Sequence, residues 1–384
     1  MKRISILMLV FFACLASAAW PQAQPQWKHK IMTFDVPGAG TGAGQGTYAN
    51  GINPAGEITG YYLDANNVYH SFLRDRDGNF TIFDPPGVGT GAWQGSGGWA
   101  IDPAGAITGD YVDGNCVEHG FLRMPDGTFI TFEAPGAGNT PGTCSPTNQL
   151  QGTIPGNINA AGVVQGWDMD TNYVYHAFLR APDGTFTIID APGAGTGAYQ
   201  GTLAAFETGL NRAGAVTGPY VDANNAWHGY LRDQDGTIDT FDVPGASQGT
   251  YPWGINPGGA TTGQYNDANG VSHGFLRTRH GKLTTFDDPK AGTGAGQGTI
   301  GVLFLPAGAI GGTYVDAGNV WHGFVRNRDG RFTNFDAPGA GKGAGQGTGV
   351  GAYLGVNPAG EITGYSVDAN GVYHGFLRSA DDEQ

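Results

Sequence analysis

The stretch Tyr373-His374-Gly375-Phe376-Leu377-Arg378 recurs seven times along the 384-residue chain, in this or a closely related form. Successive copies are 45 to 57 residues apart. A repeat of this length is typical of propellers and solenoids rather than of a single irregular core. The seven histidines are His70, His119, His176, His228, His273, His322 and His374.

The copies agree well beyond the histidine. A glycine stands ten residues before each histidine, an aspartate six before it and an arginine four after it, as in Gly364, Asp368 and Arg378. Turn-forming runs such as Asn53-Pro54-Ala55-Gly56 separate short β-prone segments, and no segment of the mature chain has a capped helical period. In the first copy the predicted strands lie at 47–52, 57–63, 68–74 and 80–84. Four antiparallel strands per repeat make one propeller blade.

The two ends of the chain complement each other. The fourth predicted strand carries a Phe-Asp or similar pair, and the first such pair, Phe34-Asp35, precedes any complete repeat, whereas none follows His374. An open solenoid would need polar capping repeats, and none is evident. We therefore predict an all-β fold, a seven-bladed β-propeller of four-stranded antiparallel blades. Its ring would be closed by an N-terminal strand, Ile31–Asp35, joining the C-terminal blade.

The N-terminus has the order of a secretory signal peptide, with basic Lys2-Arg3, an apolar run at 4–15 and small residues at 16–18. The apolar run is too short to span a bilayer. We expect a signal peptide at 1–18, a linker at 19–30 and a single propeller domain at 31–384, in a secreted or periplasmic protein.

The chain is acidic, with a formal net charge of −14. Such a surface repels nucleic acid and anionic lipid. We expect no nucleic-acid partner, no membrane insertion and no cofactor, and a monomeric protein whose partner is an extracellular glycan or protein.

The His-Ala-Phe and His-Gly-Phe cores, for example His176-Ala177-Phe178, resemble those of the bacterial extracellular HAF-repeat family, as do the secretion signal and the glycine-rich tandem units. The resemblance covers residues 31–378. It implies an exported repeat protein and supplies no catalytic residues, because the family has no assigned activity.

The repeated histidines are interpreted as structural. Alternation along a strand places His, Phe and Arg on one face, and a blade packs both of its faces, so the polar groups need partners. Acids of the fourth strand and of the preceding turn can supply them in His–Asp or Arg–Asp pairs. A ring of metal ligands or catalytic bases is the alternative, but catalysis seldom needs seven identical sites, and we predict neither a catalytic nor a metal site.

The turns of the Asp64-Ala65-Asn66-Asn67 type present oxygens at alternate positions, which leaves calcium binding open, although an Asx turn accounts for them. The second repeat holds Cys116, and Cys144 lies in the connection that leaves it. The sequence leaves open whether these two cysteines form a disulfide.

The glycine-rich connections between repeats are the candidate binding surface, because loops on a rigid scaffold carry function. A ligand is rarely sevenfold, so departures from the repeat are the more informative positions. Trp93 and Tyr199 replace the glycine that precedes glutamine in other copies, and the connection 138–151 is enlarged. Exposed aromatic rings beside amides suit stacking against sugars, with packing over a neighbouring blade as the alternative. The glutamines at the ends of these connections are predicted to ring the central channel of the propeller at one end of the molecule; they are Gln45, Gln94, Gln151, Gln200, Gln248, Gln297 and Gln346.

These observations predict a secreted, non-catalytic binding or surface protein whose ligand is a glycan or a protein. One alternative is a propeller hydrolase or lyase that acts on extracellular polysaccharide, with acids found in a single copy, such as Glu207 or Asp168. The other is an extracellular assembly or matrix protein.

Overall fold

The computed structural model describes residues 30–206, 208–349, 351 and 354–380. Within them the chain forms 29 strands in one hydrogen-bonded sheet and one 3-10 turn, Pro306–Gly308. The predicted signal peptide at 1–18 and all but the last residue of the predicted linker lie outside the described residues. No helix of the described part has the length and apolar character needed to cross a membrane. The fold is all-β and propeller-like, in agreement with the sequence.

The strands follow one pattern along the chain, shown here for the second repeat. Strands β6 (Gly95–Ile101), β7 (Ile107–Val112), β8 (Glu118–Arg123) and β9 (Phe129–Phe132) pair in this order, each antiparallel to the next. The third strand also makes a short parallel contact with the first strand of the next repeat, β10 (Gly152–Ile158). Among the described residues the equivalent contact occurs at six of the seven junctions between repeats, at the first residue of the new first strand.

The other repeats contain the equivalent strands. The first strands are β2 (Gly46–Ile52), β14 (Gly201–Thr202), β18 (Thr250–Ile255), β22 (Gly298–Phe304), β26 (Gly347–Thr348) and β27 (Leu354–Val356). The second strands are β3 (Ile58–Leu63), β11 (Val164–Met169), β15 (Val216–Val221), β19 (Thr261–Asn266), β23 (Ile310–Val315) and β28 (Ile362–Val367). The third strands are β4 (Tyr69–Arg74), β12 (Tyr175–Arg180), β16 (Trp227–Arg232), β20 (Ser272–Arg277), β24 (Trp321–Arg326) and β29 (Tyr373–Arg378). The fourth strands are β5 (Phe80–Phe83), β13 (Phe186–Ile189), β17 (Ile238–Phe241), β21 (Leu283–Phe286) and β25 (Phe332–Phe335).

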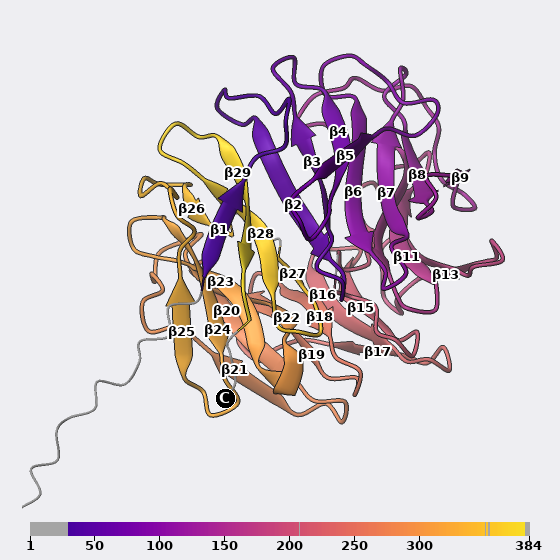
Figure 1. The fold of residues 1–384 in the computed structure, drawn as a ribbon. Coiled ribbons are helices and arrows are strands. Elements are labelled where there is room, and N and C mark those ends of the chain that lie inside the picture. Colours follow the sequence, from indigo (N-terminus) through magenta and orange to yellow (C-terminus); the bar gives the residue numbers. More distant parts are fainter. Residues whose placement is uncertain (1–29, 207, 350, 352–353, 381–384) are drawn as a thin grey trace, which may run out of the picture.

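Strand β1 (Ile31–Phe34) takes the place of a fourth strand beside β29. The pairing is antiparallel and runs from Ile31 opposite Arg378 to Phe34 opposite Gly375. Figure 1 shows the two ends of the described chain side by side, the indigo β1 against the yellow β29. The N-terminal segment therefore pairs with the C-terminal repeat, as the sequence predicted.

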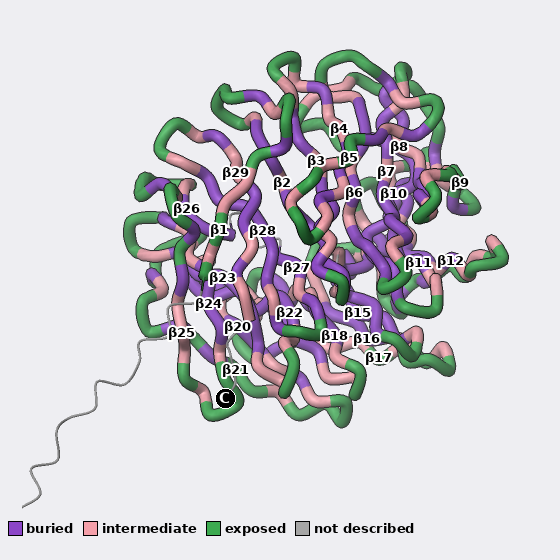
Figure 2. Tube along the Cα trace, viewed as in Figure 1, coloured by how far each residue is buried: buried purple, intermediate pink, exposed green. Residues whose placement is uncertain are grey.

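The core lies between repeats and is built from the repeated motif itself. The aromatic residue two positions after each histidine is completely buried, at 0% exposure. Buried positions follow the strands and exposed ones follow the connecting turns (Figure 2). These buried rings are Phe72, Phe121, Phe178, Tyr230, Phe275, Phe324 and Phe376.

The repeated arginine packs against the preceding repeat. The guanidinium of Arg123, for example, lies 4.7 Å from the ring centre of Phe83, the last residue of β5. The same cation–π contact recurs in six of the seven repeats, and each such contact contributes roughly 0.5–2 kcal/mol. The exception among the described residues is Arg232, because Ile189 stands where the ring would be. An Arg–Asp pair, which the sequence also left open, occurs between Arg277 and Asp239.

Candidate functional site

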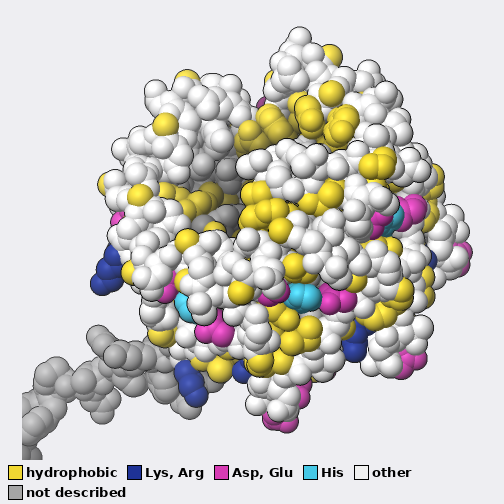
Figure 3. Space-filling model, turned by 90° about the horizontal axis from the view of Figure 1, so that it is seen from above, with side chains coloured by type: hydrophobic (Ala, Val, Ile, Leu, Met, Phe, Trp, Pro, Cys, Tyr) yellow, Lys and Arg dark blue, Asp and Glu magenta, His cyan; other side chains and the backbone are white. Residues whose placement is uncertain are grey.

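Each repeated histidine is held by an acid of its neighbouring fourth strand. The distance from the histidine Nδ1 to the carboxylate oxygen is 2.6 to 3.0 Å in all seven cases. Figure 3 shows histidines flanked by acidic side chains on the surface of the molecule. The pairs are His70–Asp84, His119–Glu133, His176–Asp190, His228–Asp242, His273–Asp287, His322–Asp336 and His374–Asp35.

The other ring nitrogen and the ring face are also occupied in most repeats. In five repeats Nε2 lies 3.5 to 3.8 Å from the aspartate six residues earlier. In five repeats a tyrosine of the second strand stacks on the imidazole, as Tyr111 does on His119 at 4.9 Å between centres. The hydrogen bonds to Glu133 and Asp190 raise the pKa of His119 and His176. These contacts explain why the motif is repeated without requiring a ligand.

Each of the seven glutamines hydrogen-bonds to the backbone of its own connection or of the turn that follows. In six repeats the amide oxygen accepts a backbone N–H from the glycine-rich connection, as Gln200 does from Gly197 at 2.9 Å. In six repeats the amide NH₂ donates to a backbone carbonyl of the next turn, as Gln200 does to Ala223 at 3.3 Å. A direct contact of these amides with a ligand stays a prediction.

The turns of the Asp-Ala-Asn type are Asx turns. In the first, Asp64 Oδ1 accepts the backbone N–H groups of Asn66 and Val68, at 2.8 and 2.9 Å. Among the described residues no three His, Cys, Asp or Glu side chains are grouped so as to hold a metal ion. The Asx hydrogen bonds account for the repeated aspartate.

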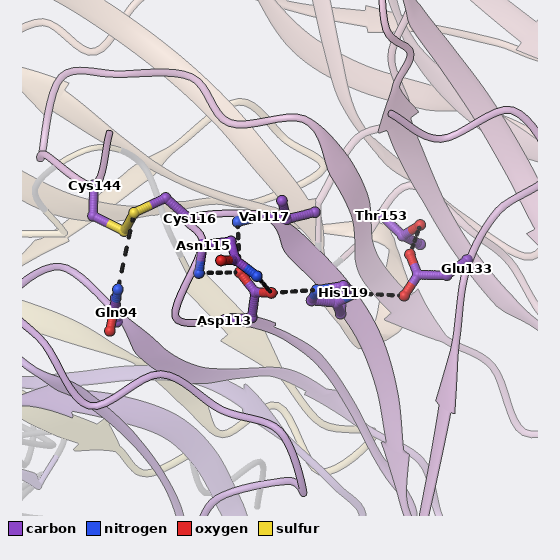
Figure 4. A network of polar contacts seen from close by, with 9 residues as sticks. All are labelled: Gln94, Asp113, Asn115, Cys116, Val117, His119, Glu133, Cys144 and Thr153. Carbon is purple, nitrogen blue, oxygen red and sulfur yellow. Dashed lines mark hydrogen bonds and ion pairs between the residues drawn. A yellow bond between two sulfur atoms is a disulfide. The ribbon is translucent and has the colours of Figure 1, made fainter. Parts of the chain in front are cut away.

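The enlarged connection after the second repeat is tied back to that repeat. Cys116 in the turn before β8 and Cys144 in the connection form a disulfide, with their Cα atoms 5.3 Å apart. Figure 4 shows this bridge beside Gln94 and the chain of contacts from Asp113 through His119 to Glu133. The disulfide ties the connection to the turn that precedes β8.

Two pockets adjoin this connection. The first, here called the Trp93 pocket, has a volume of about 240 Å³. Its walls include the rings of Tyr61, Tyr69, Trp93 and Trp99, and one side is formed by residues of the enlarged connection. Tyr61 lies 5.6 Å from Tyr69 and 5.7 Å from Trp99 between ring centres, and Tyr69 lies 6.3 Å from Trp93. The pocket therefore offers a set of neighbouring aromatic rings.

Two carboxyl groups also line the Trp93 pocket. Asp110 on β7 and Glu118 on β8 lie on the same face of the sheet, because Asp110 is opposite Gly120 and Glu118 is opposite Val112. Trp99 donates its indole N–H to Asp110. Burial raises the pKa of Asp110 to about 7. Burial, together with the charge of Asp110, raises the pKa of Glu118 well above its usual range.

The second pocket, here called the Tyr199 pocket, has a volume of about 680 Å³. It is lined by the enlarged connection together with Gln151, Tyr173 and Tyr199. The two tyrosine rings lie 5.6 Å apart between centres, and Tyr199 is 51% exposed, which leaves its ring available to a ligand. The two aromatic residues that depart from the repeat thus lie in two pockets that border one connection.

Trp93 and Tyr199 also have an unusual backbone. Their φ angles are 66° and 62°, in the left-handed region, where the equivalent glycines Gly44, Gly296 and Gly345 have 83°, 76° and 76°. A bulky residue in this region is a rare conformation that costs of the order of 1–3 kcal/mol. Strain of this kind at a pocket wall is a pointer to function.

The sequence did not single out Asp110 and Glu118. Both residues nevertheless depart from the other copies. The residue before the repeated histidine is aromatic in five copies but is Glu118 in the second, and Asp110 stands where other copies have Tyr61, Trp167 and Tyr365. Of the two acids that the sequence did single out, Glu207 lies outside the described residues, and Asp168 is at 0% exposure and lines neither pocket.

Comparisons with known proteins support the fold alone. The structure of puromycin hydrolase is similar at a TM-score of 0.51 and 12% identity, over 88% of this chain and 54% of that one. The chain spans about half the length of the puromycin hydrolase structures that it matches. BP39L lectin from Burkholderia pseudomallei matches at a TM-score of 0.47 and 10% identity, over 92% and 97% of the two chains. No family model and no curated protein matches the chain in sequence, so membership of the HAF-repeat family stays a prediction.

Proposed function

We propose that this chain is an exported, monomeric, non-catalytic protein that binds a glycan at the Trp93 and Tyr199 pockets. In this proposal the seven repeats are the blades of one propeller, closed by the pairing of β1 with β29. The equivalent strand order of the repeats and that pairing support the closed ring. The disulfide between Cys116 and Cys144 supports export, since such bonds persist in oxidising compartments.

The observation that carries the glycan assignment is the set of four neighbouring rings in the Trp93 pocket, next to the carboxyl groups. Aromatic faces pack against the apolar faces of sugar rings, and polar groups beside them receive the hydroxyls. The pocket volume of about 240 Å³ lies below the roughly 300–1,000 Å³ of a pocket for a drug-sized molecule, so it suits one sugar-sized unit. The larger Tyr199 pocket shares Asn148 and Leu150 of the connection with the Trp93 pocket, and in this proposal one glycan chain contacts both.

A glycan array on the protein lacking residues 1–18 tests the proposal. We expect the wild-type protein to bind a subset of glycans, and Trp93→Gly and Tyr199→Gly each to weaken that binding. Both substitutions restore the residue of other repeats at a positive φ angle, so the fold should be retained. A blank array at high protein concentration would remove the glycan assignment. Expression of the full chain in a bacterial host, followed by mass spectrometry of the exported product, tests cleavage before Ala19.

The second candidate function is hydrolysis of an extracellular polysaccharide in the Trp93 pocket. It is favoured by the raised pKa of Asp110, which keeps much of this group protonated near neutral pH, as a general acid requires. Release of reducing ends from a bound polysaccharide, abolished by Asp110→Asn, would establish the enzyme. Binding without release, unchanged over days, would exclude it for that polysaccharide.

A further inference from the structure

The Trp93 pocket has an uncompensated negative character. Its lining contains the carboxyl groups of Asp110 and Glu118 but no Lys, Arg or His side chain. The described residues supply Asp110 with a hydrogen bond from Trp99, which is a neutral donor, and give the carboxyl group of Glu118 no hydrogen bond or ion pair. The remaining titratable groups of the lining are Tyr61 and Tyr69, and the pKa of Tyr69 is raised to about 12 by burial and by these two acids. No group of the pocket therefore balances the charge of the acids.

The second repeat is the only one with a carboxyl group at either of these two positions. At the position of Glu118 the other repeats have Tyr, Trp or Ser, and at the position of Asp110 they have Tyr, Trp, Pro, Gln or Thr. Both side chains are only partly exposed, and a carboxylate removed from water without a cationic partner is costly; the raised pKa of both groups expresses that cost. A cation bound in the pocket would offset this cost in free energy.

The aromatic walls favour the same kind of ligand. The faces of Trp and Tyr rings carry negative potential and attract ammonium groups, and aromatic cages bind quaternary ammonium in this way. A divalent metal ion fits less well, because calcium needs six to eight oxygen ligands and the walls here are mainly rings.

We propose that the Trp93 pocket selects a positively charged group, namely the ammonium of an amino sugar with a free amine. This inference rests on the proposed glycan function and names its ligand class. The rings of Trp93, Tyr69, Tyr61 and Trp99 surround the ammonium, and Asp110 and Glu118 balance its charge. The Tyr199 pocket, which has no carboxyl group in its lining, receives a neighbouring neutral part of the glycan.

Titration calorimetry with tetramethylammonium, whose charge does not change with pH, tests the charge selection, and tert-butanol is its uncharged analogue. We expect tetramethylammonium to bind and tert-butanol to bind about tenfold more weakly or not at all. Affinity for tetramethylammonium should rise about tenfold from pH 5.5 to pH 8, because Asp110, whose pKa is raised to about 7, loses its proton over this range. Equal binding of the two probes, or affinity independent of pH, would overturn the inference.

Substitutions test whether tetramethylammonium binds in the Trp93 pocket. Asp110→Asn combined with Glu118→Gln should remove the pH dependence and lower the affinity for tetramethylammonium about tenfold, and Trp93→Gly should lower it comparably. Asp126→Asn, which removes a carboxyl group that lines neither pocket, is the matched control for charge and should leave this affinity unchanged. Thermal unfolding of each variant checks its fold. A double variant that is folded and binds like the wild type would contradict the assignment.

Matched sugars separate this inference from the proposed function. A glucosamine trimer with free amines should bind more tightly than its N-acetylated form. If the N-acetylated trimer binds equally well, the glycan function stands and the charge selection fails. If tetramethylammonium binds but no oligosaccharide does, the charge selection stands and the glycan function fails.

Discussion

At the scale of single residues, the informative positions are those where one copy departs from the others. Asp168 on β11 is such a position, because five other repeats place there a tyrosine that stacks on the histidine. Asp168 is at 0% exposure opposite His176, and neither of its carboxylate oxygens has a hydrogen-bond partner among the described residues. Burial raises its pKa to about 7, although nearby His176 acts in the opposite direction.

This raised pKa predicts a pH-dependent contribution to stability. The folded protein holds a proton on Asp168 that the unfolded chain, with a carboxyl pKa near 3.9, releases at lower pH. Stability from this group is therefore present in acid and lost as the pH rises to about 7. We expect Asp168→Asn to change the free energy of unfolding little at pH 4.5 and to raise it by about 2–4 kcal/mol at pH 8, measured by urea denaturation.

The control for this prediction is Asp126→Asn on an exposed turn. Hydrogen bonds from Thr128 lower the pKa of Asp126, so this substitution should cost stability above pH 4 rather than add it. If Asp168→Asn gives the same difference at both pH values, the carboxyl group of Asp168 does not titrate in the folded protein over this range.

At the scale of elements, the repeated glycine of the second strand has a steric cause. The first strand bulges beside it, as between Pro252 and Gly254 in β18. A Cβ placed on Gly263 would overlap the backbone oxygen of Tyr251 and press on the ring of Phe275. The same overlap with the backbone of the first strand occurs in six repeats. The bulge accompanies the glycine in five of the seven repeats of the described chain.

Gly263→Ala should accordingly destabilise the protein by about 1–3 kcal/mol or more, because backbone atoms cannot move aside as a flexible side chain can. Thermal unfolding measures the loss. Gly114→Ala is the matched control, since a Cβ there would meet no atom within 4 Å. Equal stability of the two variants would show that the first strand shifts freely.

The enlarged connection is the element on which both pockets depend. Its disulfide joins residues 28 positions apart, and a crosslink of this span contributes about 3 kcal/mol by constraining the unfolded chain. We expect Cys116→Ser combined with Cys144→Ser to lower the free energy of unfolding by about this amount and to weaken glycan binding at both pockets. A reducing agent should reproduce the effect on the wild type and leave the double variant unchanged. Undiminished binding by the folded double variant would mean that the connection holds its place without the bridge.

At the scale of the whole molecule, the sequence predicted most of the architecture because the repeated positions serve the fold. The histidines, the buried aromatic residues and the glycines recur because every unit needs the same contacts, so comparing copies reveals them. The Trp93 pocket was predicted only in part. Trp93 breaks a run of glycines and is conspicuous, whereas Asp110 and Glu118 become meaningful only when β6, β7, β8 and the enlarged connection are brought together.

The pairing of β1 with β29 predicts what holds the two ends together. Four residue pairs and the 2.8 Å contact between His374 and Asp35 join these strands, and the guanidinium of Arg74 in the first repeat lies 4.9 Å from the ring centre of Phe34. Removal of residues 19–35 from the mature chain should therefore lower the free energy of unfolding by a few kcal/mol, at about 1 kcal/mol for each lost hydrogen bond. It should also expose the edge of β29, and an exposed strand edge pairs with other chains. We expect size-exclusion chromatography to show self-association of this truncated protein, whereas removal of residues 19–29 alone should leave it monomeric. A monomeric and equally stable protein without β1 would show that the last repeat needs no outer strand.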